Sequence, residues 1–93
     1  MPEQYFSIAW PDGTTEICYS PSTIVRDHFT AGTIYPVPEF LMRCRIALTA
    51  ASDRVRERYG SPCSLALAQL ARIEATAARF PADAEVSFKL FKE

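Results

Sequence analysis

Segment 18–29, CYSPSTIVRDHF, gathers the side chains best suited to chemistry. It contains the only histidine of the chain, His28, next to Asp27 and downstream of Cys18. A catalytic trio of nucleophile, base and orienting acid needs hydrogen-bond contact between its members. Neighbouring residues on a helix point about 100° apart, and His28 reaches Cys18 only if a short helix folds back over the preceding strand. The segment also lacks the GxSxG turn that exposes a nucleophilic serine. The pattern therefore favours a cysteine packed in a sheet over a catalytic trio.

The same segment predicts a small anion site as an alternative. Backbone N–H groups at the start of a helix attract negative charge. The backbone N–H groups of Ser22 and Thr23 are expected to point outward there. The hydroxyls of Ser20 and Ser22 and the charge of Arg26 are placed to assist, with His28 nearby. A carboxylate or a phosphate is the chemistry that such a site would bind. The structural alternative is that Ser20 only caps the helix and that Arg26 pairs with a neighbouring acid.

Metal and cofactor chemistry has no support elsewhere in the chain. The three cysteines lie far apart and form no CxxC pair: Cys18, Cys44 and Cys63. No carboxylates recur at a spacing typical of a metal site, and with three glycines the chain has no glycine-rich phosphate loop. We therefore expect no metal and no cofactor, and we interpret the cysteines as small buried apolar residues.

Length and charge narrow the class of protein. Ninety-three residues predict one domain, residues 1–93, and a net charge of −1 argues against a general nucleic-acid binder. The arginines between residues 43 and 58 are interleaved with acids and indicate a solvated helix face. No apolar run is long enough to span a membrane, and the first residues lack the features of a signal peptide. We expect a cytoplasmic protein.

Three segments have the pattern of strands. Residues 5–10 are aromatic and β-branched, PDG at 11–13 is a strong turn, and residues 14–20 form the return strand of a hairpin. Residues 84–92 alternate as a third strand and most plausibly lie beside the first, which places the first strand at the centre.

The remaining segments predict helices and one loop. Ser20 and Pro21 begin a short helix over 21–28, and residues 31–38, with a glycine and two prolines, predict a loop. A long helix covers about 38–59 and ends at Gly60. Ser61 is expected to cap a second helix that extends to about Phe80.

These elements predict an α+β two-layer sandwich. A three-stranded, mainly antiparallel sheet, made of the hairpin and the C-terminal strand, is covered on one face by a helical hairpin. Tyr5, Ala9 and Phe91 are assigned to the other face, which is more apolar than a solvated face needs to be. We therefore expect association through this face, with a second copy or with another protein. Scattered surface aromatic residues are the structural alternative.

Several long segments resemble one family. WPDGTTEICYSPSTIVRDHF, YPVPEF, ALTAASDRVRERYG and CSLALAQLARIEATAARF are similar to small bacterial proteins described as nitrogen-starvation-response proteins. The resemblance implies genes that lie in a nitrilase-containing cluster, together with radical S-adenosylmethionine, acetyltransferase-like and flavin proteins. It implies no catalytic residues. Context of this kind is association and not mechanism.

Two functions of different class follow. The first is a non-catalytic accessory or interaction protein of the nitrilase-cluster pathway, which binds a second copy or a protein of that cluster. The second is a small anion- or metabolite-binding protein, or a minor enzyme, with its site between Ser20 and His28. The sequence favours the first, because no group of residues with a catalytic arrangement is apparent.

Overall fold

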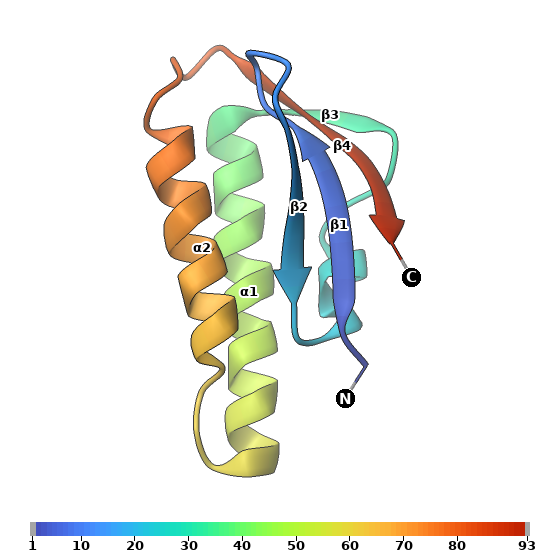
Figure 1. Cartoon of the computed structure of the whole chain (residues 1–93), viewed down its shortest axis with the longest axis vertical. Coiled ribbons are helices and arrows are strands. Elements are labelled where there is room, and N and C mark those ends of the chain that lie inside the picture. The colour runs from blue at the N-terminus through green and yellow to red at the C-terminus, as the bar shows by residue number, and fades with distance from the viewer. Residues whose placement is uncertain (1, 93) are drawn as a thin grey trace.

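The structure is a computed structural model that describes residues 2–92. Four strands, two α-helices and one short 3-10 helix follow each other along the chain (Figure 1). Their bounds are β1 Gln4–Ala9, β2 Thr15–Ser20, η1 Thr23–Asp27, β3 Thr33–Pro36, α1 Val37–Tyr59, α2 Ser64–Ala77 and β4 Glu85–Lys92. The predicted α+β class is confirmed, with both α-helices packed on one face of an antiparallel sheet.

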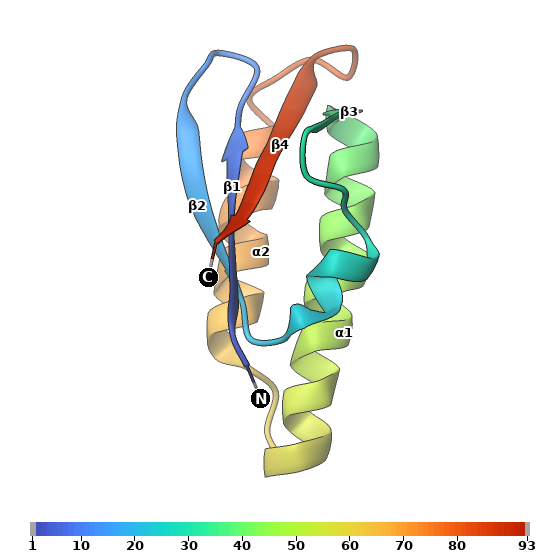
Figure 2. The same ribbon diagram turned by 90° about the vertical axis from the view of Figure 1, so that its right-hand side faces the viewer.

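The sheet has the strand order β2-β1-β4-β3, and every neighbouring pair is antiparallel. The expectation that the C-terminal strand lies beside the first is confirmed, and β1 lies between β2 and β4. Figure 2 shows β2, β1 and β4 in front of α2, with β3 and η1 in front of α1. The inner face therefore forms the core and the outer face is open.

The prediction of three strands was wrong, because residues 31–38 are not only a loop. Thr33 to Pro36 pair with β4, with Tyr35 opposite Val86. Gly32 and Pro36 made the segment resemble a loop, but a proline is tolerated on an edge strand because no neighbour needs its missing N–H. β3 occupies such an edge position.

The assignment of Phe91 to the outer face was also wrong. In the pairing of β1 with β4, Ile8 lies opposite Phe88 and Ser7 lies opposite Leu90, so Lys89 is an extra residue. A bulge of this kind reverses the alternation of side chains beyond it. Leu90 therefore takes the outer face, and Phe91 turns inward and packs on Phe88 with ring centroids 5.0 Å apart.

The long helix agrees closely with the sequence. α1 ends at Gly60, whose left-handed conformation (φ 83°) and N–H bond to the carbonyl of Arg56 form the C-cap. α2 starts later than expected: Cys63 is its N-cap residue, and Ser61 is not the cap. The N–H of Cys63 donates to Ser52 Oγ of α1 (3.1 Å), so a contact between the helices fixes where α2 begins.

The predicted end of α2 at Phe80 was three residues too late, since the helix ends at Ala77. The N–H of Phe80 bonds the carbonyl of Ala77, which tightens the chain into a turn before Pro81. Among residues 2–92, neither helix combines the length and the apolar character needed to cross a membrane.

Aromatic rings run through the core from one end to the other. Phe29 is central, with its ring stacked on Phe88 at 4.7 Å and tilted against Phe40 at 5.6 Å. Phe40 then contacts Trp10, which stacks on Phe80 at 5.9 Å. Pairs of this geometry stabilise a core by about 0.5–1.5 kcal/mol beyond the burial of their area. The stack joins η1, α1 and the sheet into one core.

Candidate functional site

Ser20 and Ser22 lie close together, but their bonds are local. Both residues are buried. Ser20 Oγ donates to the carbonyl of Ser22 (2.7 Å) and accepts the N–H of Ser22 (3.3 Å). Ser22 Oγ accepts the N–H of Ile24 and caps η1, a role that the sequence had given to Ser20. The N–H of Ser22, expected to face an anion, is therefore already donated within the turn.

Arg26 links three parts of the chain. Its Nε donates to Gln4 Oε1 (2.7 Å), and its guanidinium lies over the Phe91 ring, 4.7 Å from the centroid. Gln4 is buried, and its Nε2 donates to the carbonyl of Lys92 (2.8 Å). Arg26 thus fastens η1 to the first and last strands. Anion binding by Ser20, Ser22, Thr23, Arg26 and His28 stays a prediction.

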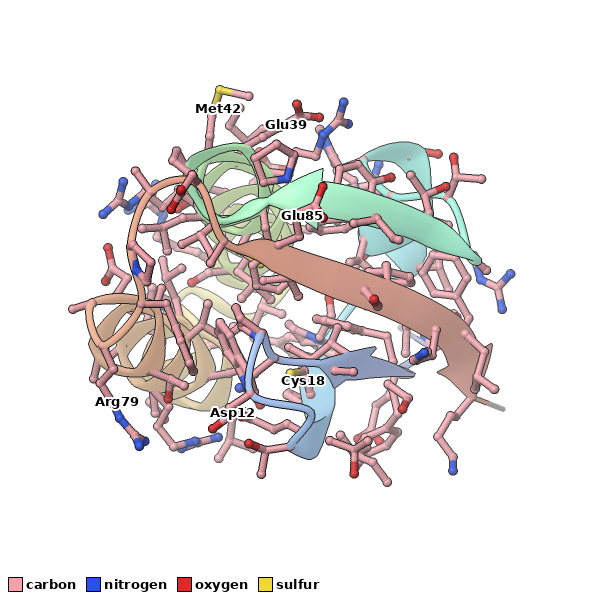
Figure 3. All side chains as sticks on the ribbon, turned by 90° about the horizontal axis from the view of Figure 1, so that it is seen from above. Asp12, Cys18, Glu39, Met42, Arg79 and Glu85 are labelled. Carbon is pink, nitrogen blue, oxygen red and sulfur yellow. The ribbon has the colours of Figure 1, made fainter. Side chains whose placement is uncertain are left out.

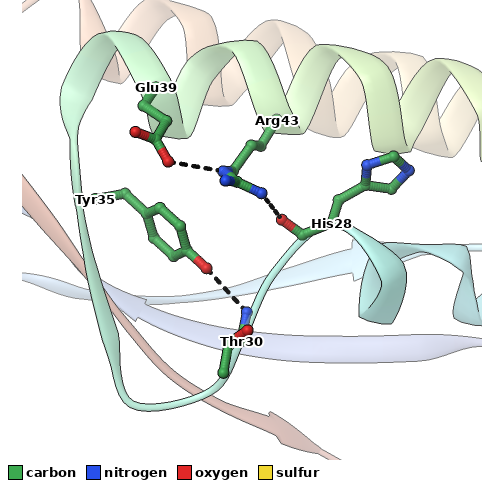
Figure 4. A network of polar contacts seen from close by, with 5 residues as sticks. All are labelled: His28, Thr30, Tyr35, Glu39 and Arg43. Carbon is green, nitrogen blue, oxygen red and sulfur yellow. Dashed lines mark hydrogen bonds and ion pairs between the residues drawn. The ribbon is translucent and has the colours of Figure 1, made fainter.

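His28 contributes its backbone to a second network (Figure 4). Its carbonyl accepts from Arg43 Nη1 (2.7 Å), while Arg43 Nε pairs with Glu39 (2.9 Å). The same guanidinium lies over the Tyr35 ring, and the Tyr35 hydroxyl accepts the N–H of Thr30 (2.9 Å). In Figure 4 the half-buried imidazole points away from these contacts. The network ties the segment between η1 and β3 to α1.

The nucleophile–base contact expected of a catalytic trio is absent among the described residues. Cys18 is fully buried in β2, and no hydrogen bond joins its thiol to His28. Burial is the main reason that the pKa of Cys18 is raised, and burial likewise raises the pKa of Cys44 well above its ordinary value. A thiolate nucleophile is therefore disfavoured at both positions. The expectation of buried cysteines is confirmed for these two, while Cys63 is partly exposed.

Within residues 2–92, no three histidine, cysteine, aspartate or glutamate side chains lie close enough to hold a metal ion. Basic side chains on the helix layer are paired with acids at several positions. Arg45 bonds Glu74 across the two helices (2.8 Å), and Arg56 bonds Asp53 within α1 (3.2 Å). These contacts agree with the interpretation of the arginines as a solvated face.

The outer face of the sheet carries an apolar side chain from every strand. These four residues, here called the outer patch, are Tyr5, Ile17, Ile34 and Leu90, with exposed fractions of 40%, 57%, 57% and 46%. Ile17 and Leu90 both lie opposite Ser7, one on each side of β1. Of the residues predicted for this face, Tyr5 belongs to the patch, Ala9 is half-buried beside it, and Phe91 lies on the other face.

An open groove of about 500 Å³ adjoins one end of the outer patch. Its apolar lining includes Ala9 and Ile34, and its acidic residues are Asp83 and Glu85. Figure 3 views this end of the molecule from above, with Glu85 above the sheet and Asp12 on the hairpin turn. Hydrogen bonds from the hydroxyl and the N–H of Thr14 hold the pKa of Asp12 below its ordinary value. Apolar and acidic residues thus both line the groove.

Of the four residues of the outer patch, only Tyr5 was predicted for this face from the sequence. Tyr5 followed from the alternation of β1, but Ile34 lies on a strand that was expected to be a loop, and Leu90 follows a bulge. The sequence did not single out Ile17. The available signal was its β-branched side chain on an edge strand, opposite the small residue Ser7.

Comparison with known proteins identifies a family, but no individual curated protein or solved structure that matches. A family model described as nitrogen starvation-induced protein NitG matches residues 5–91. No curated protein and no solved structure matches the chain. The match spans all four strands and both helices.

Proposed function

Because the chain belongs to the family of nitrogen starvation-induced proteins NitG, we propose that it is a non-catalytic accessory protein of the nitrogen-starvation response. It acts by binding another protein in the cytoplasm. The partner is a protein of a nitrilase-containing gene cluster, as the resemblance of the sequence implies. The remaining question is which surface binds it.

The observation that carries this proposal is the outer patch. A solvated face of an antiparallel sheet normally presents polar side chains, whereas here each strand contributes an exposed apolar one. Exposed apolar side chains gathered on one face are typical of a protein interface. Removing such surface from water stabilises a complex by about 25 cal/mol per Å² of apolar area before the costs of association.

The polar segment 18–29 supports the non-catalytic part of the proposal. Ser20, Ser22 and Arg26 each have hydrogen-bond partners that position η1. A catalytic group must be within reach of a substrate atom, and these groups are committed to the protein itself.

The groove adds a chemical preference. Asp83 and Glu85 make no ion pair within the described part of the chain, so the lining of the groove carries negative charge. Complementary charge steers a partner and fixes its orientation. We expect a partner surface with an apolar side chain flanked by lysine or arginine.

The test is co-purification from nitrogen-starved cells of the host, followed by native mass spectrometry. Leu90→Lys and Tyr5→Lys place a charge in the outer patch and should abolish the complex. Met42→Lys and Ile46→Lys are matched controls, because these residues are equally exposed on α1. Both controls should bind like the parent.

Two results would contradict the proposal. If the outer-patch variants kept the partner while the α1 variants lost it, binding would belong to the helix layer. If the parent were recovered with a bound small molecule and no protein, the accessory function would be wrong.

A further inference from the structure

The pairing of the strands arranges the outer face of the sheet in rows. One row has Ser7 at its centre, with Ile17 on one side and Leu90 on the other. The next row contains Ala9 and Ser87, which lie opposite each other on β1 and β4 and line the groove. Ser7, Ala9 and Ser87 are small and half-buried, whereas Ile17 and Leu90 are exposed. The face therefore has projecting apolar side chains in one row and a hollow in the next.

β4 carries opposite charges at its two ends. Glu85 is its first residue and Lys92 its last, and both are exposed. Their neighbours Val86 and Phe91 belong to the core, so Glu85 and Lys92 both take the outer face. Neither makes an ion pair among residues 2–92. A strand with this pattern of charge is complementary to its own antiparallel copy.

We propose that two copies of this protein stack face to face through the outer patch, about a two-fold axis that crosses the strands between the row of Ser7 and the row of Ala9. Such an axis lays each strand antiparallel over its own copy. Stacked sheets pack about 10 Å apart, with their strands rotated by roughly 30°. Leu90 of one copy then lies over Ser87 of the other, and Lys92 lies over Glu85. The symmetry makes each contact twice.

The groove receives an aromatic side chain in this arrangement. Tyr5 lies one row beyond Ser7 on β1, so in the second copy it is opposite the segment that follows Ala9. Pro11 and Gly13 of that segment line the groove together with Ala9. A tyrosine ring fills apolar space, while its hydroxyl stays at the polar margin. The groove of each copy is thus occupied by Tyr5 of the other.

Two other ways to stack the same face are less favourable. An axis parallel to the strands would gather Glu85 of both copies at one end of the interface and Lys92 of both copies at the other, and like charges that face each other oppose association. An axis through the row of Ser7 would place Leu90 over its own copy, whereas the side chains of stacked sheets interdigitate. It would also leave Glu85 without an opposite charge. Charge and side-chain size therefore select the same register.

The size of the face predicts the strength of the dimer. β4 has eight residues and the sheet has four strands, so the face spans about 26 Å by about 19 Å. The contact is about 500 Å² on each copy, and the total of about 1,000 Å² reaches the lower limit of specific interfaces. We expect a reversible dimer with a Kd of about 10–100 µM.

A second copy and a protein partner would cover the same face and therefore exclude each other. The dimer is then the form that the protein takes without its partner, in which the outer patch is removed from water. This inference goes beyond the proposed function, because the contacts between the two copies need no other protein.

The experiment is sedimentation velocity of the purified protein between about 5 µM and 1 mM, a range that includes the expected Kd. The parent should shift from monomer to dimer as its concentration rises. Glu85→Lys and Lys92→Glu each place like charges opposite each other twice, so each should raise the Kd by at least about tenfold. The double variant with both changes restores opposite charges and should dimerise like the parent. Glu57→Lys, the same change at an exposed residue of α1, is the matched control and should also dimerise like the parent.

Leu90→Lys tests the apolar contact independently and should remain monomeric over the whole range, with circular dichroism to establish that every variant is folded. A parent that stays monomeric at about 1 mM would overturn the proposal. So would single charge variants or a Leu90→Lys variant that dimerise like the parent, or a double variant that fails to recover the dimer. Because only the purified protein is used, loss of this inference leaves partner binding untouched. A dimer that recruits no protein in nitrogen-starved cells would instead contradict the proposed function alone.

Discussion

Three polar side chains of segment 18–29 are hydrogen-bonded within the protein, whereas apolar side chains in the outer patch face solvent. Ser20, Ser22 and Arg26 position a short helix, and each has a hydrogen-bond partner. Tyr5 and Leu90 are 40% and 46% exposed. Ser20, Ser22 and Arg26 thus have structural roles, while the exposed surface of the sheet includes apolar residues.

The comparison teaches that whether a side chain already has interaction partners says more about its availability for binding than its residue type does. A buried hydroxyl with two hydrogen bonds stabilises the fold and offers little to a ligand. An exposed apolar side chain gains free energy only when something covers it. Four predictions test this comparison, from the largest expected effect on stability to the smallest.

Replacement of Phe29 should have the largest effect. Phe29 contacts the rings of Phe6, Tyr35, Phe40 and Phe88. Phe29→Ala leaves a cavity at the centre of the stack and should lower the free energy of unfolding by about 3–5 kcal/mol. Urea denaturation measures the change, with the exposed Leu67→Ala as a control that should change by less than about 0.5 kcal/mol. A small loss in Phe29→Ala would mean that the inner face is less tightly packed than its geometry indicates.

Replacement of Ser20 tests the structural role of segment 18–29. Ser20→Ala leaves the N–H and carbonyl of Ser22 without their partner in a buried turn, which should cost about 1–3 kcal/mol. Ser22→Ala removes the cap of η1 and should cost about 1 kcal/mol. Ser61→Ala is the control, because Ser61 is exposed and does not cap α2. Full stability of Ser20→Ala would leave its hydroxyl available for the anion site.

Alkaline pH tests the buried thiols. Burial raises the pKa of Cys18 and Cys44, so the unfolded chain loses these protons at a lower pH than the folded protein does. Their contribution is fully present below pH of about 9 and declines as the pH rises further. Urea denaturation at pH 8 and pH 10 measures this loss. At pH 8 a thiol-reactive dye should label Cys63 quickly and the other two only on unfolding; equal labelling of Cys18 would contradict its burial.

Charge in the outer patch should have the smallest effect on stability. Leu90→Lys replaces a half-exposed side chain on a face that packs against nothing, so the free energy of unfolding should change by less than about 0.5 kcal/mol. Partner binding should nevertheless be lost. Thermal and urea denaturation of Leu90→Lys measure the change in its free energy of unfolding. A loss above about 2 kcal/mol would show that Leu90 supports the fold, and the binding result would then lose its meaning.

Sequence patterns predicted the features that depend on neighbouring residues alone, such as turns, helix ends and the alternation of side chains. The PDG turn, the end of α1 at Gly60 and the inward residues of β1 follow from turn chemistry and periodicity, and the structure confirms them. Three errors came from tertiary contacts. β3 exists because β4 offers it a partner, and α2 begins where Ser52 accepts the N–H of Cys63. The bulge at Lys89 leaves no mark in the sequence, because any residue can occupy it.

The residues of the candidate site were likewise predicted where neighbouring residues decide their positions, and missed where long-range contacts decide them. The sequence correctly brought Ser20 and Ser22 into one turn, but it could not show that Gln4, far away in the chain, receives Arg26. It indicated an apolar outer face from β1, yet two of the four residues of the outer patch depend on β3 and on the bulge. Periodicity places side chains on faces, whereas long-range pairing decides which faces meet.

The position of β4 between β1 and β3 has a consequence for synthesis. The ribosome produces β4 after the other three strands. Within residues 2–92, β4 is the only neighbour of β3 and one of the two neighbours of β1. Until it emerges, the nascent chain has a helical hairpin and a β1–β2 hairpin whose central strand is open on one side. At about 5–20 residues per second, this interval lasts for seconds. A stop codon before residue 85 should therefore yield a product that is degraded or aggregates, because the sheet closes only after β4 has been made.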